Sequence, residues 1–197
     1  MKVLELHIGK NRNKIVTIKA SDMNTAGKIL VAGIIGTTFM TMFSYLIADK
    51  EEEQYREPEL LNALIDRSKY LPSISNKKSH PLGWGAHFLI GILFMISYRM
   101  LWHKALKDPS TAKTIIIGAA SGAVGIISWK IFFSQHDNPP HNDRYGYYRQ
   151  LFFAHIIFSA GAIVSYKQLS STNPTSNKDF KNLITRIKVE REREIQI

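Results

Sequence analysis

Four apolar blocks, separated by charged stretches, constrain the fold of this chain more than any other feature. They occupy residues 27–48, 84–102, 114–133 and 151–167. A helix needs about 20 consecutive apolar residues to cross the hydrocarbon core of a bilayer, and within lipid a single segment satisfies its backbone hydrogen bonds only as a helix. The third block lacks the polar stripe that a helix of a soluble bundle carries. The sequence therefore predicts an all-α integral membrane protein, a bundle of four transmembrane helices.

The distribution of basic residues predicts the orientation. Of the 26 Lys and Arg residues, 17 lie in 1–28, 99–113 and 167–197, whereas the seven acidic residues of 49–80 offset most of the others. Cytoplasmic segments retain Lys and Arg, so we expect both termini in the cytoplasm and a multi-pass protein of the bacterial inner membrane. This placement also accounts for the formal net charge of +10 without nucleic acid as a partner.

The segments between the blocks carry signals of their own. The outer loop 49–83 contains an amphipathic stretch, 57–68, whose apolar residues suit a short helix in the outer interface. The N-terminal segment 1–26 alternates in places and predicts a small β-hairpin. The C-terminal tail 168–197 fits a further strand or a charged helix, and a basic tail near lipid headgroups is the alternative for both ends. A short cytoplasmic turn, 103–113, joins the second and third blocks.

Five of the seven histidines fall on the predicted outer side. His87 lies about one turn inside the second block and His155 about one turn inside the fourth. Both of these helices run inward from the outer surface, so the two imidazoles should lie at similar depth. Ionisable groups below the membrane interface are costly and point to function.

One interpretation of this layer is a transition-metal or haem site, because imidazole binds zinc, copper, nickel and haem iron. The candidate ligands are His87, His155, His141, His136 and Asp137. Against it, the sequence has no closely spaced histidine pair, and a nearby lysine would repel a cation.

A second interpretation is a pocket for a polar or anionic ligand, such as a lipid headgroup or a quinone. Its candidate donors are His87, His155, Lys130, Arg144 and Arg149, and an aromatic wall at interface depth would come from Trp84, Tyr145, Tyr147 and Tyr148. The third interpretation is structural: the histidines hold the outer His/Tyr-rich loop, 134–150, onto the bundle, and the aromatics form the usual interface belt. In all three, Asn142 and Asp143 are expected to cap the turn into the fourth helix.

From residue 83 to about 165 the layout resembles uncharacterised bacterial inner-membrane proteins of the YagU type. The shared features are an apolar helix opening at His87, a short basic turn, a glycine-rich helix, the stretch Asn138-Pro-Pro-His141, and His155 near the start of the last helix. They cover less than half of the chain. The resemblance implies the membrane topology and draws attention to His87, Pro140 and His155, and it implies no reaction.

The sequence favours a non-enzymatic function. It has no serine nucleophile motif, no phosphate-cradling glycine loop and no pair of carboxylates in the apolar blocks. We expect a small accessory or structural subunit that binds a partner, a lipid or a small ligand through its outer His/Tyr/Asp-rich face. Its expected partners are membrane lipids and either other membrane subunits or further copies of itself. The alternatives are a metal- or haem-binding membrane protein and, as an oligomer, a small transporter or channel component.

Overall fold

The computed structural model describes residues 23–71 and 73–171, which form helices and no strands. The helices, in chain order, are α1 (Thr25–Glu51), α2 (Glu57–Asp66), α3 (Pro81–Leu101), α4 (His103–Lys107), α5 (Thr111–Gln135) and α6 (Arg144–Ser171). The β-hairpin predicted near the N-terminus and the strand or helix predicted in the C-terminal tail concern residues outside these ranges.

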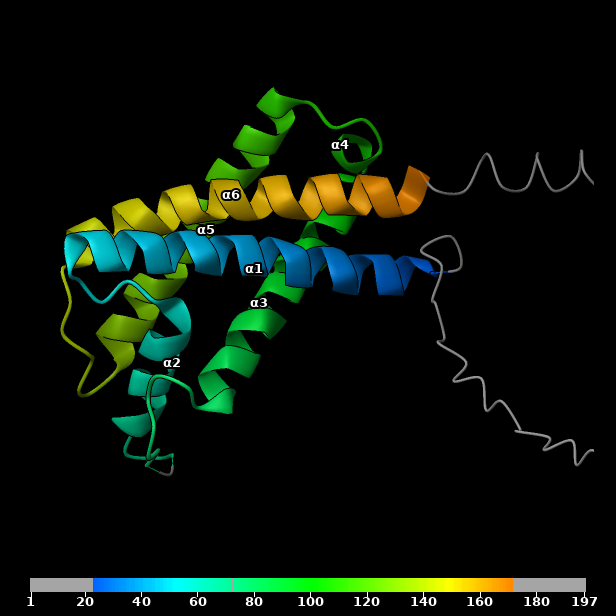
Figure 1. The fold of residues 1–197 in the computed structure, drawn as a ribbon. Helices are drawn as coiled ribbons and strands as arrows, with labels where there is room; N and C mark the ends of the chain where they lie inside the picture. Colours follow the sequence, from blue (N-terminus) through cyan, green and yellow to red (C-terminus); the bar gives the residue numbers. More distant parts are fainter. Residues whose placement is uncertain (1–22, 72, 172–197) are drawn as a thin grey trace, which may run out of the picture.

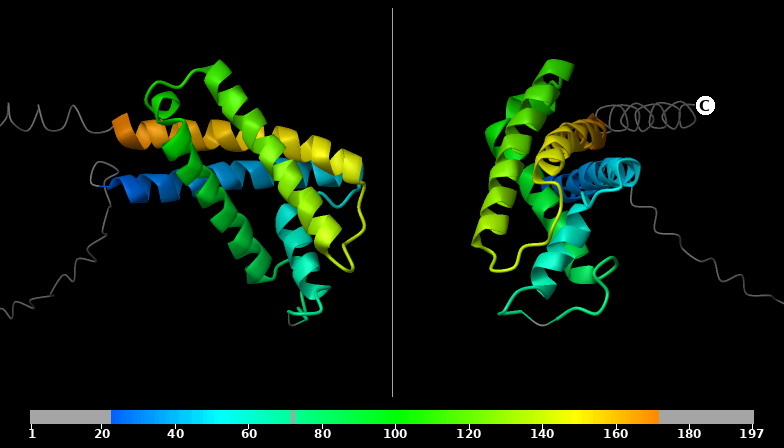
Figure 2. Two further views of the ribbon diagram at one scale, coloured as in Figure 1. Left: turned by 180° about the vertical axis from the view of Figure 1, so that it is seen from behind. Right: turned by 90° about the vertical axis from the view of Figure 1, so that its left-hand side faces the viewer.

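The long helices form two layers (Figures 1 and 2). α1 and α6 lie side by side and antiparallel, while α3 packs across α1, α5 packs across α6, and α2 packs against α3. Small residues allow these close crossings: a methyl group on Gly36 would lie 2.8 Å from Cβ of Ala162, and one on Gly118 would lie 2.6 Å from Cα of Ile156. Such contacts hold helices together where lipid removes the hydrophobic driving force between them.

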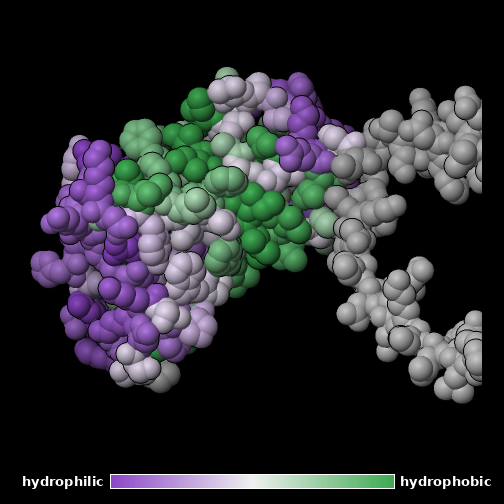
Figure 3. Space-filling view, viewed as in Figure 1, coloured by the Kyte–Doolittle hydropathy of each residue, from purple (hydrophilic) through white to green (hydrophobic). Residues whose placement is uncertain are grey.

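The prediction of an all-α fold is confirmed for the described residues, and three of the four predicted spans have the length and apolar composition to cross a membrane. Helices α1, α3 and α5 are long and apolar enough to cross a membrane. Most of their outward side chains are apolar, and the molecule shows an apolar band between hydrophilic regions (Figure 3). Helix α6 has 28 residues but is more polar, because Gln150, His155 and Ser159 interrupt its apolar run and face the interior. The fourth span therefore stays a prediction.

The outer segments differ from the predicted boundaries. α6 begins at Arg144, before the predicted start at residue 151, because Asp143 caps it: the Asp143 carboxylate accepts hydrogen bonds from the backbone N–H groups of Tyr145 and Gly146, each at 3.0 Å. The expected capping role of Asp143 is thus confirmed. A helix is present within 57–68, but α2 packs into the molecule, and Glu57 and Leu60 on it are buried.

Two ends of the bundle carry different chemistry. The start of α1, the end of α3, α4 and the end of α6 meet at one end, which we call the basic end. α2 and the loop before α6 lie at the opposite end, which we call the α2 end (Figure 1). The basic segments that the sequence assigns to one side of the membrane, as far as the structure describes them, gather at the basic end.

Candidate ligand-binding cavity

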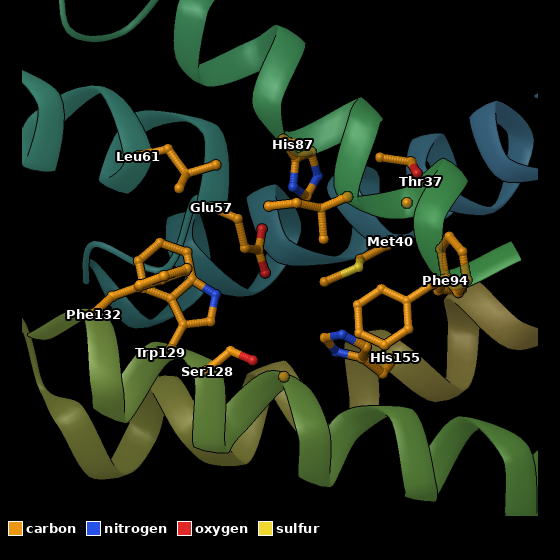
Figure 4. Close-up of a pocket in the computed structure, with 14 residues that line it drawn as sticks. Thr37, Met40, Glu57, Leu61, His87, Phe94, Ser128, Trp129, Phe132 and His155 are labelled. Atoms are coloured by element: carbon orange, nitrogen blue, oxygen red, sulfur yellow. The ribbon is translucent and has the colours of Figure 1, made fainter. Parts of the chain in front are cut away.

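A cavity of about 150 Å³ lies between α3 and α5 in the half of the bundle nearer the α2 end. α1 and α6 form its back wall and α2 closes one side (Figure 4). Its lining is mostly apolar, with rings from Phe94, Trp129 and Phe132. An apolar cavity of about 150 Å³ accommodates benzene, so this space matches one six-membered ring.

Two glycines create the space around the polar side chains of the cavity. A methyl group on Gly125 would lie 2.6 Å from Cε1 of His155, so the imidazole occupies the volume that a side chain on α5 would need. Gly91 on α3 likewise leaves room for the side chain of Thr37, because a methyl group at position 91 would collide with the hydroxyl of Thr37. The cavity therefore depends on glycine at both positions.

The hydrogen bonds of His87 fix its tautomer. Its Nε2 lies 2.9 Å from Oγ1 of Thr41, and that hydroxyl donates to the carbonyl oxygen of Thr37 at 2.8 Å. A hydroxyl has a single proton to donate, so while Thr41 donates to Thr37, Nε2 of His87 is the donor in its bond to Thr41. In the neutral ring, Nδ1 is left as an acceptor.

His155 is fixed in the same way by its own helix. Its Nδ1 lies 2.8 Å from the carbonyl oxygen of Leu151, which only accepts, so Nδ1 carries the proton. The ring also meets Phe94 edge-on, with 5.2 Å between centroids. Nε2 of the neutral ring is an acceptor, and both imidazoles border the same cavity (Figure 4). The structure thus brings together His87 and His155.

Glu57 is the third polar group of the cavity. Its side chain is only 1% exposed, and its Oε1 accepts a hydrogen bond of 2.8 Å from the hydroxyl of Ser44, which in turn accepts one of 2.6 Å from Gln150. Within the described residues its Oε2 has no hydrogen-bond partner. α2 is not a spanning segment, and burial there raises the pKa of Glu57 from 4.5 to about 7. Near neutral pH the carboxyl group therefore exchanges between a donor and an acceptor form.

Sequence reasoning missed Glu57. The residue lies in a segment predicted to face the outer interface, where a carboxylate is ordinary. A usable signal was present in Ser44, inside the first block, and Gln150, directly before the fourth: their polar atoms lie at matching depth on two helices and need a buried partner.

The other predicted metal ligands do not join His87 and His155. Nε2 of His136 donates a hydrogen bond of 2.9 Å to the carbonyl oxygen of Leu64, and Asp137 forms an ion pair of 2.9 Å with Lys69. His141 is exposed. Across residues 23–71 and 73–171, no three His, Asp or Glu side chains form a group able to hold a metal ion.

The lysine and the two arginines predicted to bind a ligand lie outside the cavity and contact neighbouring segments. Nζ of Lys130 lies 5.5 Å from the ring centre of Tyr148. The guanidinium of Arg144 lies 3.4 Å from the ring centre of Phe133 and donates to a backbone carbonyl of the preceding loop. Arg149 forms an ion pair at 3.3 Å with a glutamate at the end of α1.

Of the aromatic residues predicted to bind a ligand, Tyr145 lies on the surface, whereas Trp84 and Tyr148 pack beside other aromatic rings. Tyr145 is 79% exposed. Trp84 donates from Nε1 to the carbonyl oxygen of Lys78 at 3.0 Å and packs beside Tyr45, with 6.0 Å between ring centroids. Tyr148 packs next to Tyr147, whose hydroxyl is buried without a hydrogen-bond partner among the described residues.

Comparison of the chain with protein-family models, with curated proteins and with solved structures finds no match. The resemblance to proteins of the YagU type stays a prediction.

Proposed function

We propose that this protein is a non-enzymatic, four-span membrane subunit that binds the ring of a small amphipathic ligand in the cavity between α3 and α5. The observation that carries this proposal is the meeting of His87, His155 and Glu57 on one ring-sized space. Each imidazole is held by a hydrogen bond on one nitrogen and presents the other as an acceptor. Positioned polar groups in an otherwise apolar pocket are typical of small-molecule sites.

The proposed topology has α6 as the fourth span. It lies antiparallel to α1 and is of similar length, with 28 residues against 27. Gln150, His155 and Ser159 on it are buried in the bundle, so these polar side chains do not meet lipid. We assign the basic end to the cytoplasm and the α2 end to the outer side, on the retention of Lys and Arg in the cytoplasm.

The polar groups favour a ligand with hydroxyl groups on its ring. Two neutral imidazoles accept hydrogen bonds, and a hydroquinone carries two hydroxyl donors on a ring of the size of benzene. Glu57 adds a group that donates when protonated and accepts when ionised. Ile90 and Phe132 line the cavity and are also 36% and 45% exposed, so the entrance lies between α3 and α5. In the proposed topology this entrance faces lipid, where an apolar tail would remain.

The binding test is a titration of a short-chain hydroquinone, kept reduced, into the full chain in mild detergent. Replacing one imidazole removes one hydrogen bond, so His87→Ala and His155→Ala should each weaken binding about five- to tenfold. If one ring binds both imidazoles, the loss of either bond lets the ring shift and weakens the other bond, so the double variant should cost less than the sum of the two single variants. His141→Ala, which changes an exposed histidine outside the cavity, is the matched control and should bind like the wild type. Fully additive losses would contradict a shared site.

Metal binding is the second candidate function, and the acceptor nitrogens on His87 and His155 favour it. The benzene-sized volume leaves no room for a porphyrin, so the candidate is a single transition-metal ion. Metal analysis and an absorption spectrum of gently purified protein distinguish the two. A stoichiometric metal that is lost in both histidine variants would replace the hydroquinone proposal. Membrane proteins that co-purify stably in the same sample would support the subunit role.

A further inference from the structure

A second cavity, of about 360 Å³, lies at the basic end, on the opposite side of the bundle from Glu57. The start of α1, the end of α3, α4 and the end of α6 all contribute to it. Its lining has no acidic residue and includes five basic ones: Lys28, Arg99, His103, Lys107 and Lys167. Three parts of the chain that are distant in sequence therefore converge to concentrate positive charge around one space.

None of the basic residues of this cavity has a carboxylate partner among the described residues. Nε of Arg99 is buried and has no hydrogen-bond partner in this part of the chain. Partial desolvation, together with the charges of Arg99 and Lys107, lowers the pKa of His103. An anion in the cavity would reduce the repulsion between these positive charges and would accept a hydrogen bond from Nε of Arg99.

The position of the cavity suggests where this anion comes from. Met100 and Leu101, which follow Arg99 directly, are 76% and 70% exposed, and Leu30 beside Lys28 is 46% exposed. Apolar surface of this kind at the end of a span is covered by acyl chains in a bilayer. A charged headgroup attached to those chains would then lie at the level of the basic cavity, where basic pockets between helices bind anionic lipids.

We propose that the cavity at the basic end binds the phosphate headgroup of an anionic phospholipid. The guanidinium of Arg99 supplies the directional donors, since its planar fork matches phosphate oxygens, and Lys107 and Lys167 supply further positive charge. This site is separate from the hydroquinone cavity, and its existence does not depend on the proposed function. It gives the positive charge of the basic end a specific ligand in addition to its role in orientation.

The test uses the delipidated full chain in an uncharged detergent and a titration with short-chain phosphatidic acid, followed by thermal stability and native mass spectrometry. We expect one bound lipid per chain and a rise in melting temperature, with no rise for phosphatidylcholine of the same chain length. Each lost charge near an anionic lipid weakens binding about fivefold, so Arg99→Gln/Lys107→Gln should weaken it about 25-fold. Lys104→Gln is the matched control, because Lys104 is an exposed residue of α4 that does not line the cavity.

Several results would overturn this proposal. Equal losses in Lys104→Gln and in the double variant would show a diffuse charge effect and no site. Equal stabilisation by inorganic phosphate at the same concentration would assign the cavity to a soluble phosphate compound. Without lipid, removal of like charges should leave the melting temperature unchanged or raise it. A lower melting temperature for the double variant in lipid-free detergent would instead make Arg99 a structural residue.

Discussion

Replacing Glu57 by glutamine should remove a pH dependence of stability that the wild-type protein shows. The buried carboxyl group has a pKa of about 7, compared with 4.5 for a free side chain. The folded protein therefore keeps this proton over a range in which the unfolded chain has lost it. The resulting stability is fully present below pH 4.5 and is lost as the pH rises to about 7. At about 1.4 kcal/mol per pH unit, the loss is about 3 kcal/mol.

Glutamine at this position resembles the protonated acid, because its amide oxygen still accepts from Ser44 and it carries no charge. The assay is equilibrium unfolding of the full chain in mixed micelles across this pH range. Relative to the wild type, Glu57→Gln should gain about 3 kcal/mol of unfolding free energy from acidic to slightly alkaline pH. Glu52→Gln, which changes an exposed carboxylate, should keep the wild-type slope. Identical slopes for Glu57→Gln and the wild type would refute the assignment of a buried, proton-binding Glu57.

Three further predictions address the packing and the topology. Gly125→Ala should destabilise the fold by about 1–3 kcal/mol and weaken hydroquinone binding, because the new methyl group displaces the ring of His155, whereas Gly85→Ala meets open space and should do neither. Asn62→Ala should lower the unfolding free energy by about 3 kcal/mol in a denaturation assay, because the buried amide bonds two backbone carbonyls and one backbone N–H. A reporter fused after Lys107 should be active only in the cytoplasm, and activity on the outer side would reverse the proposed orientation.

Much of the helical framework follows from hydropathy alone. Long runs without charge identify α1, α3 and α5, because a spanning helix must face lipid along much of its length. The same criterion is weaker for α6, whose side chains Gln150, His155 and Ser159 point inward. A hydropathy average does not record which face of a helix carries the polar groups, so a span with a polar inner face resembles a less apolar helix.

The cavity was only partly predictable. The depth of a residue in the membrane follows from its position within an apolar block, but the residues of other helices that surround it at that depth do not. The positions of His87 and His155 within their blocks indicated a shared layer, and the structure places both on one cavity. Their common distance from the outer surface, however, also suggested His136 and Asp137, which bond instead to α2 and the segment after it. The contribution of Glu57 depends on how α2 folds back against α3, and no local pattern encodes that tertiary contact.

The central claim is that the space between α3 and α5 holds a ring, and filling that space tests it most directly. Ser128 borders the cavity and bonds the carbonyl oxygen of Val124 in its own helix at 2.9 Å, so Ser128→Leu adds volume without removing a polar group from His87, His155 or Glu57. Ser97→Leu is the matched control, because Ser97 makes the same kind of bond on α3 away from the cavity. Calorimetric titration with the short-chain hydroquinone should show binding in the wild type and in Ser97→Leu, and none in Ser128→Leu. Unchanged binding in a folded Ser128→Leu protein would place the ligand elsewhere and contradict the account.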